Sequence, residues 1–256
     1  MLLDPTALAG RTVLLTGATG GIGTVTAATL AAAGAMVIAQ HRGDPVMARV
    51  ALAGVPDDRL ALVAGELDGA AAVRGLWARV VAEHAVDVLV LNAAVNLETS
   101  IDGPDEDWDA GWEQTLAVNV VGAGALLREA VRHFADHGGG TVVVISSWAA
   151  EQGSRLPDLS AYAASKAAVR NLAQTFARAY ARRGVRVHVV APGVVRAGMA
   201  VAGMDDSVQA AVADGLAMGR YVEADEVAAL VAFLTTDGCP SLTGSTVDIN
   251  GASYIR

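Results

Sequence analysis

The sequence predicts an α/β fold: a doubly wound parallel sheet of about seven strands with helices on both faces. Short apolar runs alternate with longer helical patterns along the whole chain. The runs are continuously apolar, as strands are when both faces of a parallel sheet are covered. A glycine-rich turn separates the first strand from the first helix, an arrangement typical of such sheets. Composition nowhere changes in the manner of a linker, so residues 1–256 are expected to form a single domain.

The expected strands are seven apolar runs, each followed by a turn or a helical pattern. They cover residues 11–17, 35–40, 60–66, 86–94, 140–147, 185–193 and 244–251. The first helix is alanine-rich and is expected to end at Gly34. Later helical patterns cover about 69–84, 107–135, 160–182 and 224–235. In the third of these, "LSAYAASKAAV" is built almost wholly from small residues, and alanine is the best helix former.

Composition limits the classes of partner and compartment. With 53% hydrophobic and 18% charged residues the chain is globular, and its net charge of −9 disfavours nucleic acid and, mildly, an acidic carrier protein. The single cysteine, Cys239, excludes an internal disulfide and favours a reduced, cytoplasmic setting. It is most simply a small residue in a C-terminal turn. No signal peptide and no membrane-spanning stretch is expected.

The glycine-rich turn "TGATGGIG" spans residues 16–23. Glycine suits positions 17, 21 and 23 if the chain turns sharply there and its backbone approaches a pyrophosphate with no Cβ in the way. The N-terminus of the following helix then offers free N–H groups and a partial positive charge. The turn therefore predicts a dinucleotide cofactor, and the alternative is an ordinary strand-to-helix connection.

The spacing Gly-x-x-x-Gly-x-Gly resembles that of the short-chain dehydrogenase/reductase family, and later motifs agree in order. These are "LNAA" at 91–94, "VNVVG" at 118–122, "ISS" at 145–147, "YAASK" at 162–166 and "APGVV" at 191–195. The C-terminal "LTGSTVDINGASYI" resembles that of β-ketoacyl-carrier-protein reductases. The resemblance covers essentially the whole chain. It implies a Rossmann-type fold and an NAD(P)-dependent oxidoreductase that interconverts a ketone and a secondary alcohol.

Four catalytic residues are carried over from the resemblance: Asn119, Ser147, Tyr162 and Lys166. Tyr162 and Lys166 share one helix face, and a nearby ammonium is expected to lower the tyrosine pKa from about 10. Tyr162 then gives a proton to a carbonyl oxygen as hydride arrives, or removes the alcohol proton in reverse. In the family, the lysine also binds the nicotinamide ribose, the serine holds the substrate oxygen, and the asparagine bends its helix and holds a water that links the lysine to solvent.

Alternatives remain open for several of these positions. Ser146 could replace Ser147, since alternation along a strand points only one of them at the site. Asn119 could be a helix-interior residue satisfied by backbone, and Tyr162 could simply pack. The acidic run 102–109 either caps the long helix or rims a substrate pocket. The five histidines lack ligand spacing with acids or cysteines, so no metal site is expected.

The sequence departs from the family pattern around the substrate site. The segment from Ser147 to Tyr162 is longer than the common family spacing, so "EQGSRLPD" at 151–158 is expected to bulge outward and reshape the pocket rim. Trp148 is bulky for its place and either narrows the site or packs. Ala197 stands where the family often has a threonine that bonds the nicotinamide carboxamide.

The cofactor preference depends on the residues after the second strand. His41 falls where the family's NAD enzymes carry aspartate, and Gln40, His41 and Arg42 include no carboxylate. Arg42 can fork onto a 2′-phosphate, so NADP(H) is preferred and NAD(H) is possible. Arg42 could instead be a solvated residue that stacks on adenine without contacting a phosphate. Asp44 could swing back toward the ribose and favour NAD(H), although its place before Pro45 suits a helix N-cap. The full expected cofactor set is Gly17, Thr19, Gly21, Ile22, Gly23, His41, Arg42, Glu66, Leu67, Asn92, Ala93, Ala94, Tyr162, Lys166, Pro192, Gly193 and Val195.

Three functions and one assembly are expected. The first function is an NADP(H)-dependent oxidoreductase for a small carbonyl or alcohol metabolite. The alternatives are a 3-oxoacyl-carrier-protein or 3-oxoacyl-CoA reductase, and a non-catalytic cofactor-binding regulator. A homotetramer is expected, with a dimer as fallback, because in the family the helices corresponding to 107–135 and 160–182 pair across a two-fold axis. The small residues thought to allow this are Ala117, Gly122, Ala123, Gly124, Ala168, Ala173 and Ala177, which could instead pack on the sheet.

Overall fold

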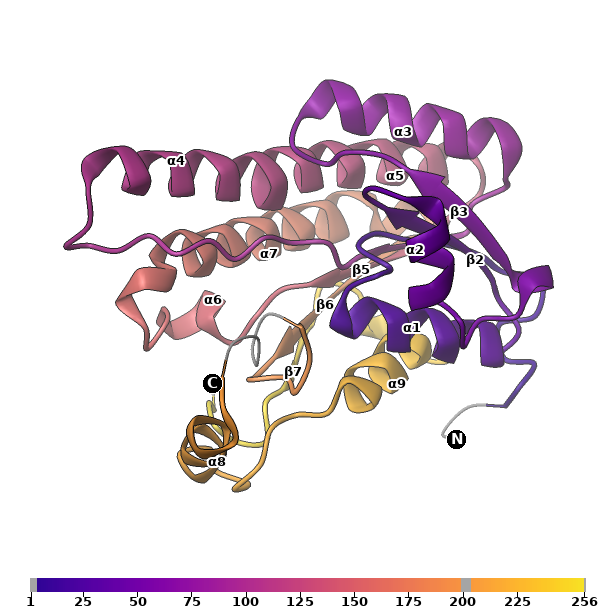
Figure 1. Cartoon of the computed structure of the whole chain (residues 1–256). Helices are drawn as coiled ribbons and strands as arrows, with labels where there is room; N and C mark the ends of the chain where they lie inside the picture. The colour runs from indigo at the N-terminus through magenta and orange to yellow at the C-terminus, as the bar shows by residue number, and fades with distance from the viewer. Residues whose placement is uncertain (1–3, 199–203, 256) are drawn as a thin grey trace.

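The computed structural model describes residues 4–198 and 204–255 and contains one seven-stranded parallel sheet (Figure 1). Its strand order is β3-β2-β1-β4-β5-β6-β7, and every neighbouring pair is parallel. The predicted doubly wound sheet is therefore confirmed. The order reverses between β1 and β4, the point at which such sheets bind ligands beyond their carboxyl ends. The strands are β1 (Thr12–Leu15), β2 (Met36–His41), β3 (Leu60–Ala64), β4 (Val88–Leu91), β5 (Gly140–Ile145), β6 (Val185–Pro192) and β7 (Thr246–Ile249).

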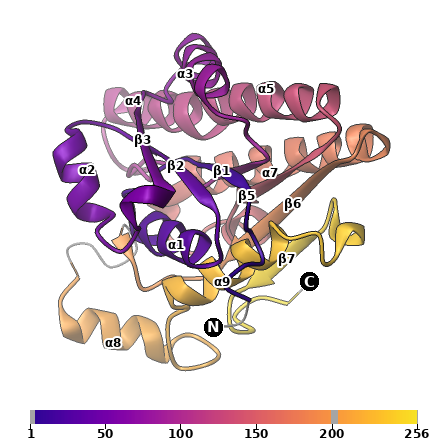
Figure 2. The ribbon, with the colours of Figure 1, turned by 90° about the vertical axis from the view of Figure 1, so that its right-hand side faces the viewer.

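Helices cover both faces of the sheet (Figure 2). One apolar cluster joins the sheet to α1 and α9 through residues such as Leu30 and Val231, and another joins it to α3, α5 and α7 through residues such as Leu76 and Leu126. These two clusters form the core. The α-helices are α1 (Gly21–Ala32), α2 (Pro45–Ala51), α3 (Ala70–Glu83), α4 (Asp105–Leu116), α5 (Ala123–Asp136), α6 (Ala149–Gln152), α7 (Ser160–Tyr180), α8 (Asp206–Asp214) and α9 (Ala224–Leu234).

The single helix expected over 107–135 consists of α4, a π-helical turn η2 (Ala117–Gly122) and α5. Asp105, Glu106 and Asp107 occupy the first turn of α4, where negative charge interacts favourably with the helix dipole, but the N-cap is Pro104 and no side chain caps the helix. The π-helical turn contains Asn119, at which a bend was predicted. Gly122 ends this turn against the segment after β3: a Cβ there would lie 1.8 Å from the carbonyl oxygen of Leu67. This contact fixes the helix against the segment that follows β3.

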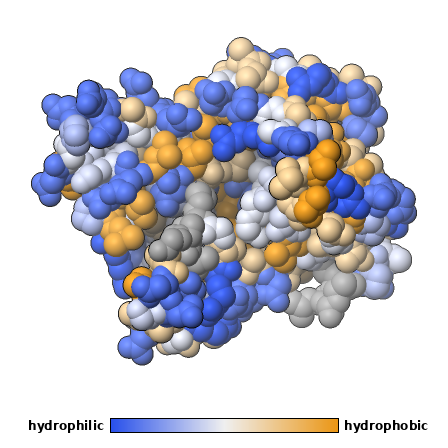
Figure 3. Space-filling model, in the orientation of Figure 1, coloured by the Kyte–Doolittle hydropathy of each residue, from blue (hydrophilic) through white to orange (hydrophobic). Residues whose placement is uncertain are grey.

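Several short helices were not anticipated from periodicity. Among them are α2, α6 and α8, each of nine residues or fewer. The sequence did predict the start of α2, because Asp44 is its N-cap and its carboxylate accepts a hydrogen bond from the N–H of Val46. Figure 3 shows a hydrophobic patch over α2, where Val46, Met47 and Val50 are more than 60% exposed.

The seven small residues expected at an interface differ in exposure, and two of them, Ala117 and Gly124, are half-buried. Gly122, Ala123, Ala173 and Ala177 are buried within this chain, so for them packing inside the protomer is the correct interpretation. Ala168 is exposed, and Val121 on the same pair of helices is 51% exposed. A pairing surface on these helices would therefore use fewer of the small residues than the sequence indicated. None of the helices in the described ranges is both long and apolar enough to span a bilayer.

Candidate active site

The glycine-rich turn joins β1 to α1 and approaches its neighbours so closely that side chains are excluded. Gly17 has φ +62°, and a Cβ there would lie 2.8 Å from the Cα of Ala93. A Cβ on Gly23 would lie 2.1 Å from the carbonyl oxygen of Gly17, and one on Gly21 would lie 2.7 Å from the Cβ of Ala197. No side chain caps the first turn of α1, so its N–H groups remain available to an anion. The cradle fits the pyrophosphate of a dinucleotide.

Two polar side chains hold this turn against the adjoining strands. Asn92, after β4, donates from its amide to the carbonyls of Thr16 and Gly17 at 3.0 and 3.1 Å. Gln40, buried at the end of β2, accepts from the N–H of Gly17 at 2.8 Å and donates to the carbonyl of Gly65 at 2.7 Å. In the sequence, Gln40 stands out only as a residue that is not a carboxylate. A buried amide at the end of a strand next to a glycine-rich turn was the available signal for its structural role.

The residues after β2 differ sharply in exposure. His41 is 2% exposed and its Nδ1 has no hydrogen-bond partner, whereas Arg42 is exposed. The described part of the chain gives the Arg42 guanidinium no carboxylate partner, since Asp44 is engaged as the cap of α2. Arg42 is therefore free to meet an anion at this edge.

The other expected cofactor residues border the carboxyl edge of the sheet. Thr19 and Ile22 lie at the glycine-rich turn, and Ala93 and Ala94 follow β4. Glu66 is exposed and Leu67 is buried in the segment after β3. Pro192 ends β6, Gly193 donates its N–H to the carbonyl of Ile249 at 3.0 Å, and Val195 forms an isolated parallel bridge with Val222. The structure thus brings the expected set to one edge of the sheet.

Ser147, Tyr162 and Lys166 lie together beyond the end of β5. The Ser147 hydroxyl is hydrogen-bonded to the Tyr162 phenol, and the Lys166 ammonium lies 5.6 Å from the centroid of the Tyr162 ring. Lys166 is 4% exposed, and its Nζ donates to the carbonyl of Ile145 at 2.8 Å. Ser146 points elsewhere, because its hydroxyl donates to the carbonyl of Lys166 at 3.0 Å. Of the two serines, Ser147 is therefore the one beside the phenol.

Asn119 is tied to the backbone. Its amide oxygen accepts from the N–H of Val95 at 2.9 Å, and its amide nitrogen donates to the carbonyl of Val95 at 2.8 Å. The nitrogen also lies 3.0 Å from the hydroxyl of Ser165, which donates to the carbonyl of Tyr162. Asn119 is thus a polar residue whose hydrogen bonds are satisfied by backbone, which is the alternative given above. The water that it is expected to hold between Lys166 and solvent remains a prediction. Ser165, which no sequence motif indicated, links Asn119 to α7.

The protonation of the tyrosine–lysine pair differs from expectation. Burial raises the pKa of Tyr162 above 10, and only the hydrogen bond from Ser147 opposes it. The expectation that Lys166 lowers the tyrosine pKa was therefore wrong for the protein by itself. Burial also lowers the pKa of Lys166 to about 8, since an ammonium loses hydration there. At neutral pH the phenol keeps its proton and the lysine is mostly charged.

The pKa of Lys166 predicts how stability depends on pH. The unfolded chain binds this proton more tightly, so between about pH 8 and pH 10.5 the unfolded state carries more protons and stability rises with pH. Below pH 8 the full penalty applies, roughly 3 kcal/mol for a pKa that is lowered from 10.5 to about 8. We expect the excess stability of Lys166→Met over the wild type to shrink from pH 7 to pH 9.5, measured by urea unfolding. A constant difference would contradict a buried, titrating ammonium.

The segment between Ser147 and Tyr162 forms the rim of this site. Trp148 donates its N–H to the carbonyl of Pro192 at 3.0 Å, and the Arg155 guanidinium lies 5.3 Å from the centroid of the Trp148 ring. Thr99, which is fully buried, ties the segment to the loop after β4: its N–H and hydroxyl both donate to the carbonyl of Asp158, at 2.7 and 3.0 Å. The last residue of the segment 151–158 is therefore held against the loop that follows β4.

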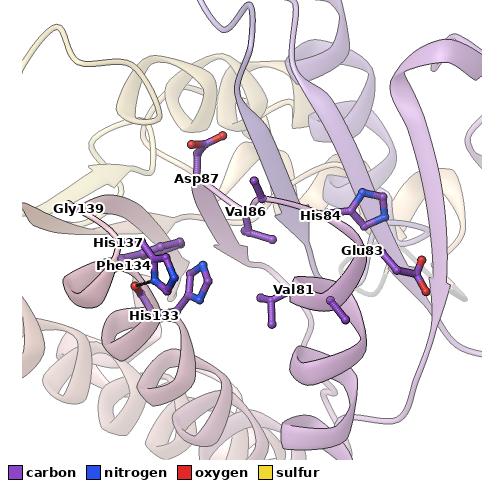
Figure 4. Close-up of a pocket in the computed structure, with 11 residues that line it drawn as sticks. Val81, Glu83, His84, Val86, Asp87, His133, Phe134, His137 and Gly139 are labelled. Carbon is purple, nitrogen blue, oxygen red and sulfur yellow. Dashed lines mark hydrogen bonds between the residues drawn. The ribbon is translucent and has the colours of Figure 1, made fainter.

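A depression lies at the edge of the sheet opposite to the candidate active site, where β4 and β5 begin (Figure 4). It measures about 460 Å³ and is bordered by the ends of α3 and α5, with His84 on one wall and His133 and His137 on the other. The His133 and His137 rings stack with centroids 4.1 Å apart. Across the described ranges, no group of three or more His, Cys, Asp or Glu side chains could hold a metal ion.

Comparison with known proteins identifies the class. Residues 11–207 match the family model for short chain dehydrogenases. The chain is 35% identical to glucose 1-dehydrogenase of Gluconobacter oxydans over 249 residues, 95% of this chain and 91% of that protein. It superposes with a TM-score of 0.84 on 3-oxoacyl (acyl-carrier-protein) reductase from Agrobacterium tumefaciens with NADP bound, at 30% identity over 96% and 95% of the two chains. The same TM-score relates it to the Brucella melitensis 3-ketoacyl-(acyl-carrier-protein) reductase complexed with NADH, at 25% identity over 97% and 100%.

This chain belongs to the short-chain dehydrogenase/reductase family, and the predicted resemblance is confirmed. It is an NAD(P)-dependent oxidoreductase that acts on a small molecule.

Proposed function

We propose that the chain, as one dinucleotide-binding domain over residues 1–256, is an NADP(H)-dependent oxidoreductase that interconverts a ketone and a secondary alcohol on a small metabolite. The observation that carries this proposal is the hydrogen-bonded pair of Ser147 and Tyr162 beside the buried Lys166, at the same sheet edge as the glycine cradle. The glycine-rich turn and the first turn of α1 would hold the pyrophosphate, and Lys166 the nicotinamide ribose. A reduced nicotinamide bound there supplies the hydride.

Side chains of the site then donate the proton and stabilise the charges that form. Tyr162, neutral at pH 7 because burial raises its pKa, donates its proton to the carbonyl oxygen of the substrate. Ser147 hydrogen-bonds the same oxygen and stabilises the charge that develops on it. Lys166, which carries its charge below its pKa of about 8, stabilises the phenolate left behind. Asn119 positions the loop after β4 through Val95.

The decisive experiment is NADPH oxidation at 340 nm against a panel of ketones that includes acetoacetyl thioesters. Turnover of simple ketones supports the proposal. A strong preference for thioesters would favour the alternative, a 3-oxoacyl-carrier-protein or 3-oxoacyl-CoA reductase. The similarity to two solved carrier-protein reductases supports this alternative. Cofactor binding without any turnover would favour a regulatory protein.

The proposed NADP(H) preference makes a separate prediction at Arg42. Within the described ranges the exposed Arg42 guanidinium forms no ion pair, and the neighbouring Asp44 carboxylate caps α2 instead. We expect Arg42→Ala to weaken NADPH binding by about one to two decades and to leave NADH binding nearly unchanged, since a charge-assisted contact with the 2′-phosphate is lost. Titration of both cofactors into both proteins measures this. Tighter NADH binding by the wild type, or an equal loss for both cofactors, would contradict the assignment.

We also propose a homotetramer, with a dimer as fallback, formed through the surface of α4, η2, α5 and α7 that includes Val121 on η2 and Ala168 on α7. The exposure of Val121, 51% in this chain, supports such a surface. Light scattering at micromolar concentration is expected to give a mass of four chains, or of two. A stable species at the 26.0 kDa of one chain would contradict the proposal.

A further inference from the structure

Among the residues that the structure describes, Arg155 is a cation without an anionic partner at the rim of the candidate active site. It is exposed, and its one described contact is the face of Trp148, with the guanidinium carbon 5.3 Å from the ring centroid. The acids on the same segment do not neutralise it: Glu151 is paired with Arg170, and no ion pair joins Asp158 to Arg155 in the described ranges. A chain with a net charge of −9 thus keeps one arginine uncompensated at this place.

The backbone on both sides of Arg155 is anchored beside the catalytic groups. Trp148 directly follows Ser147, and its hydrogen bond to Pro192 holds it between the ends of β5 and β6. On the other side, Thr99 holds the carbonyl of Asp158 through two hydrogen bonds. Arg155 therefore lies against the side chain of Trp148, the residue next to Ser147, on a segment that hydrogen bonds hold at Trp148 and at Asp158.

We propose that Arg155, resting on Trp148, binds a carboxylate of the substrate, so that the site takes oxo acids and hydroxy acids in preference to neutral ketones and alcohols. This inference rests on the proposed function and names its substrate class. A guanidinium that stacks on an aromatic ring keeps its N–H edge free, and that edge matches a carboxylate with two parallel hydrogen bonds. The anchored rim sets the separation between the carboxylate and the carbon that reacts at Ser147 and Tyr162.

The test compares 4-oxocyclohexanecarboxylate with its methyl ester, using NADPH and four proteins: wild type, Arg155→Ala, Arg155→Lys and Arg132→Ala. Arg132, exposed on α5, is the matched control for loss of one positive charge. We expect the wild type to prefer the carboxylate about ten-fold in kcat/KM, an exposed charge-assisted contact being worth that order. Arg155→Ala should lose the preference through KM with kcat for the ester unchanged, Arg155→Lys should keep part of it, and Arg132→Ala should match the wild type.

A wild type without carboxylate preference, or a preference that survives in Arg155→Ala, overturns the inference while turnover of the ester still supports the proposed function. Calorimetric binding of 4-oxocyclohexanecarboxylate to the protein saturated with NADP⁺ tests the anion site separately from the proposed reaction. Binding that depends on Arg155 without any turnover would leave the anion site standing and overturn the proposed reaction. If the compound is neither bound nor turned over, the anion site is overturned. Thermal melting of each variant checks that it is folded.

Discussion

Replacing Tyr162 by phenylalanine is expected to lower kcat at least about 100-fold while the fold and cofactor binding are kept. The change removes one oxygen, the atom that we propose as the proton donor and that is hydrogen-bonded to Ser147. General acid catalysis typically contributes about 10²–10⁴-fold. The measurement is NADPH oxidation with the best ketone of the panel, together with cofactor titration and thermal melting of the variant.

Tyr180→Phe is the matched control, because Tyr180 lies on the same helix, is half-buried and packs edge-on against Phe176. It makes the same chemical change away from the proposed site and should leave kcat within about two-fold, the range of surface changes remote from the chemistry. If Tyr162→Phe keeps more than roughly a tenth of the wild-type kcat, a loss below that expected of general acid catalysis, Tyr162 is not the acid.

The second large effect is expected at Gly122, where alanine should destabilise the fold by about 3 kcal/mol or more. The added Cβ would lie 1.8 Å from the carbonyl oxygen of Leu67, and neither backbone segment can yield without moving the π-helical turn or the loop after β3. Because Leu67 belongs to the expected cofactor set, the dissociation constant for NADPH should rise as well. Urea unfolding and cofactor titration measure the two effects.

Gly75→Ala is the control for this substitution. Gly75 lies within α3, and a Cβ there would meet nothing within 4 Å. Alanine should therefore stabilise the protein by up to about 1 kcal/mol, through helix propensity alone. Equal effects of the two substitutions would show that the contact between Gly122 and Leu67 is not a tight one in solution.

Much of the fold could be predicted because it depends on local and repeated signals. Seven continuously apolar runs identified the strands, and a glycine-rich turn located the phosphate cradle. The cap at Asp44 was predictable from the proline that follows it. The grouping of Ser147, Tyr162 and Lys166 followed from the family resemblance together with the four-residue spacing of the last two.

The remainder depends on three-dimensional surroundings that no local pattern reports. The direction of the Tyr162 pKa shift was missed because it reflects burial by several elements, which outweighs one cation near the ring. The bonds of Asn119 were uncertain because Val95, its partner, lies on another segment and presents only backbone. The small residues on α5 and α7 pack inward or outward according to helix rotation, which composition does not specify.

Gln40 has a consequence for the interpretation of pH profiles. Its amide uses both of its polar atoms, one on the glycine-rich turn and one on the segment after β3, and neither atom gains or loses a proton at ordinary pH. A carboxylate at this position could not donate to Gly65 and would have added a charge that varies with acidity. The shape of the phosphate cradle should therefore be constant while Tyr162 and Lys166 titrate. A pH dependence of kcat can then be assigned to the titration of Tyr162 and Lys166 rather than to a change in the shape of the phosphate cradle.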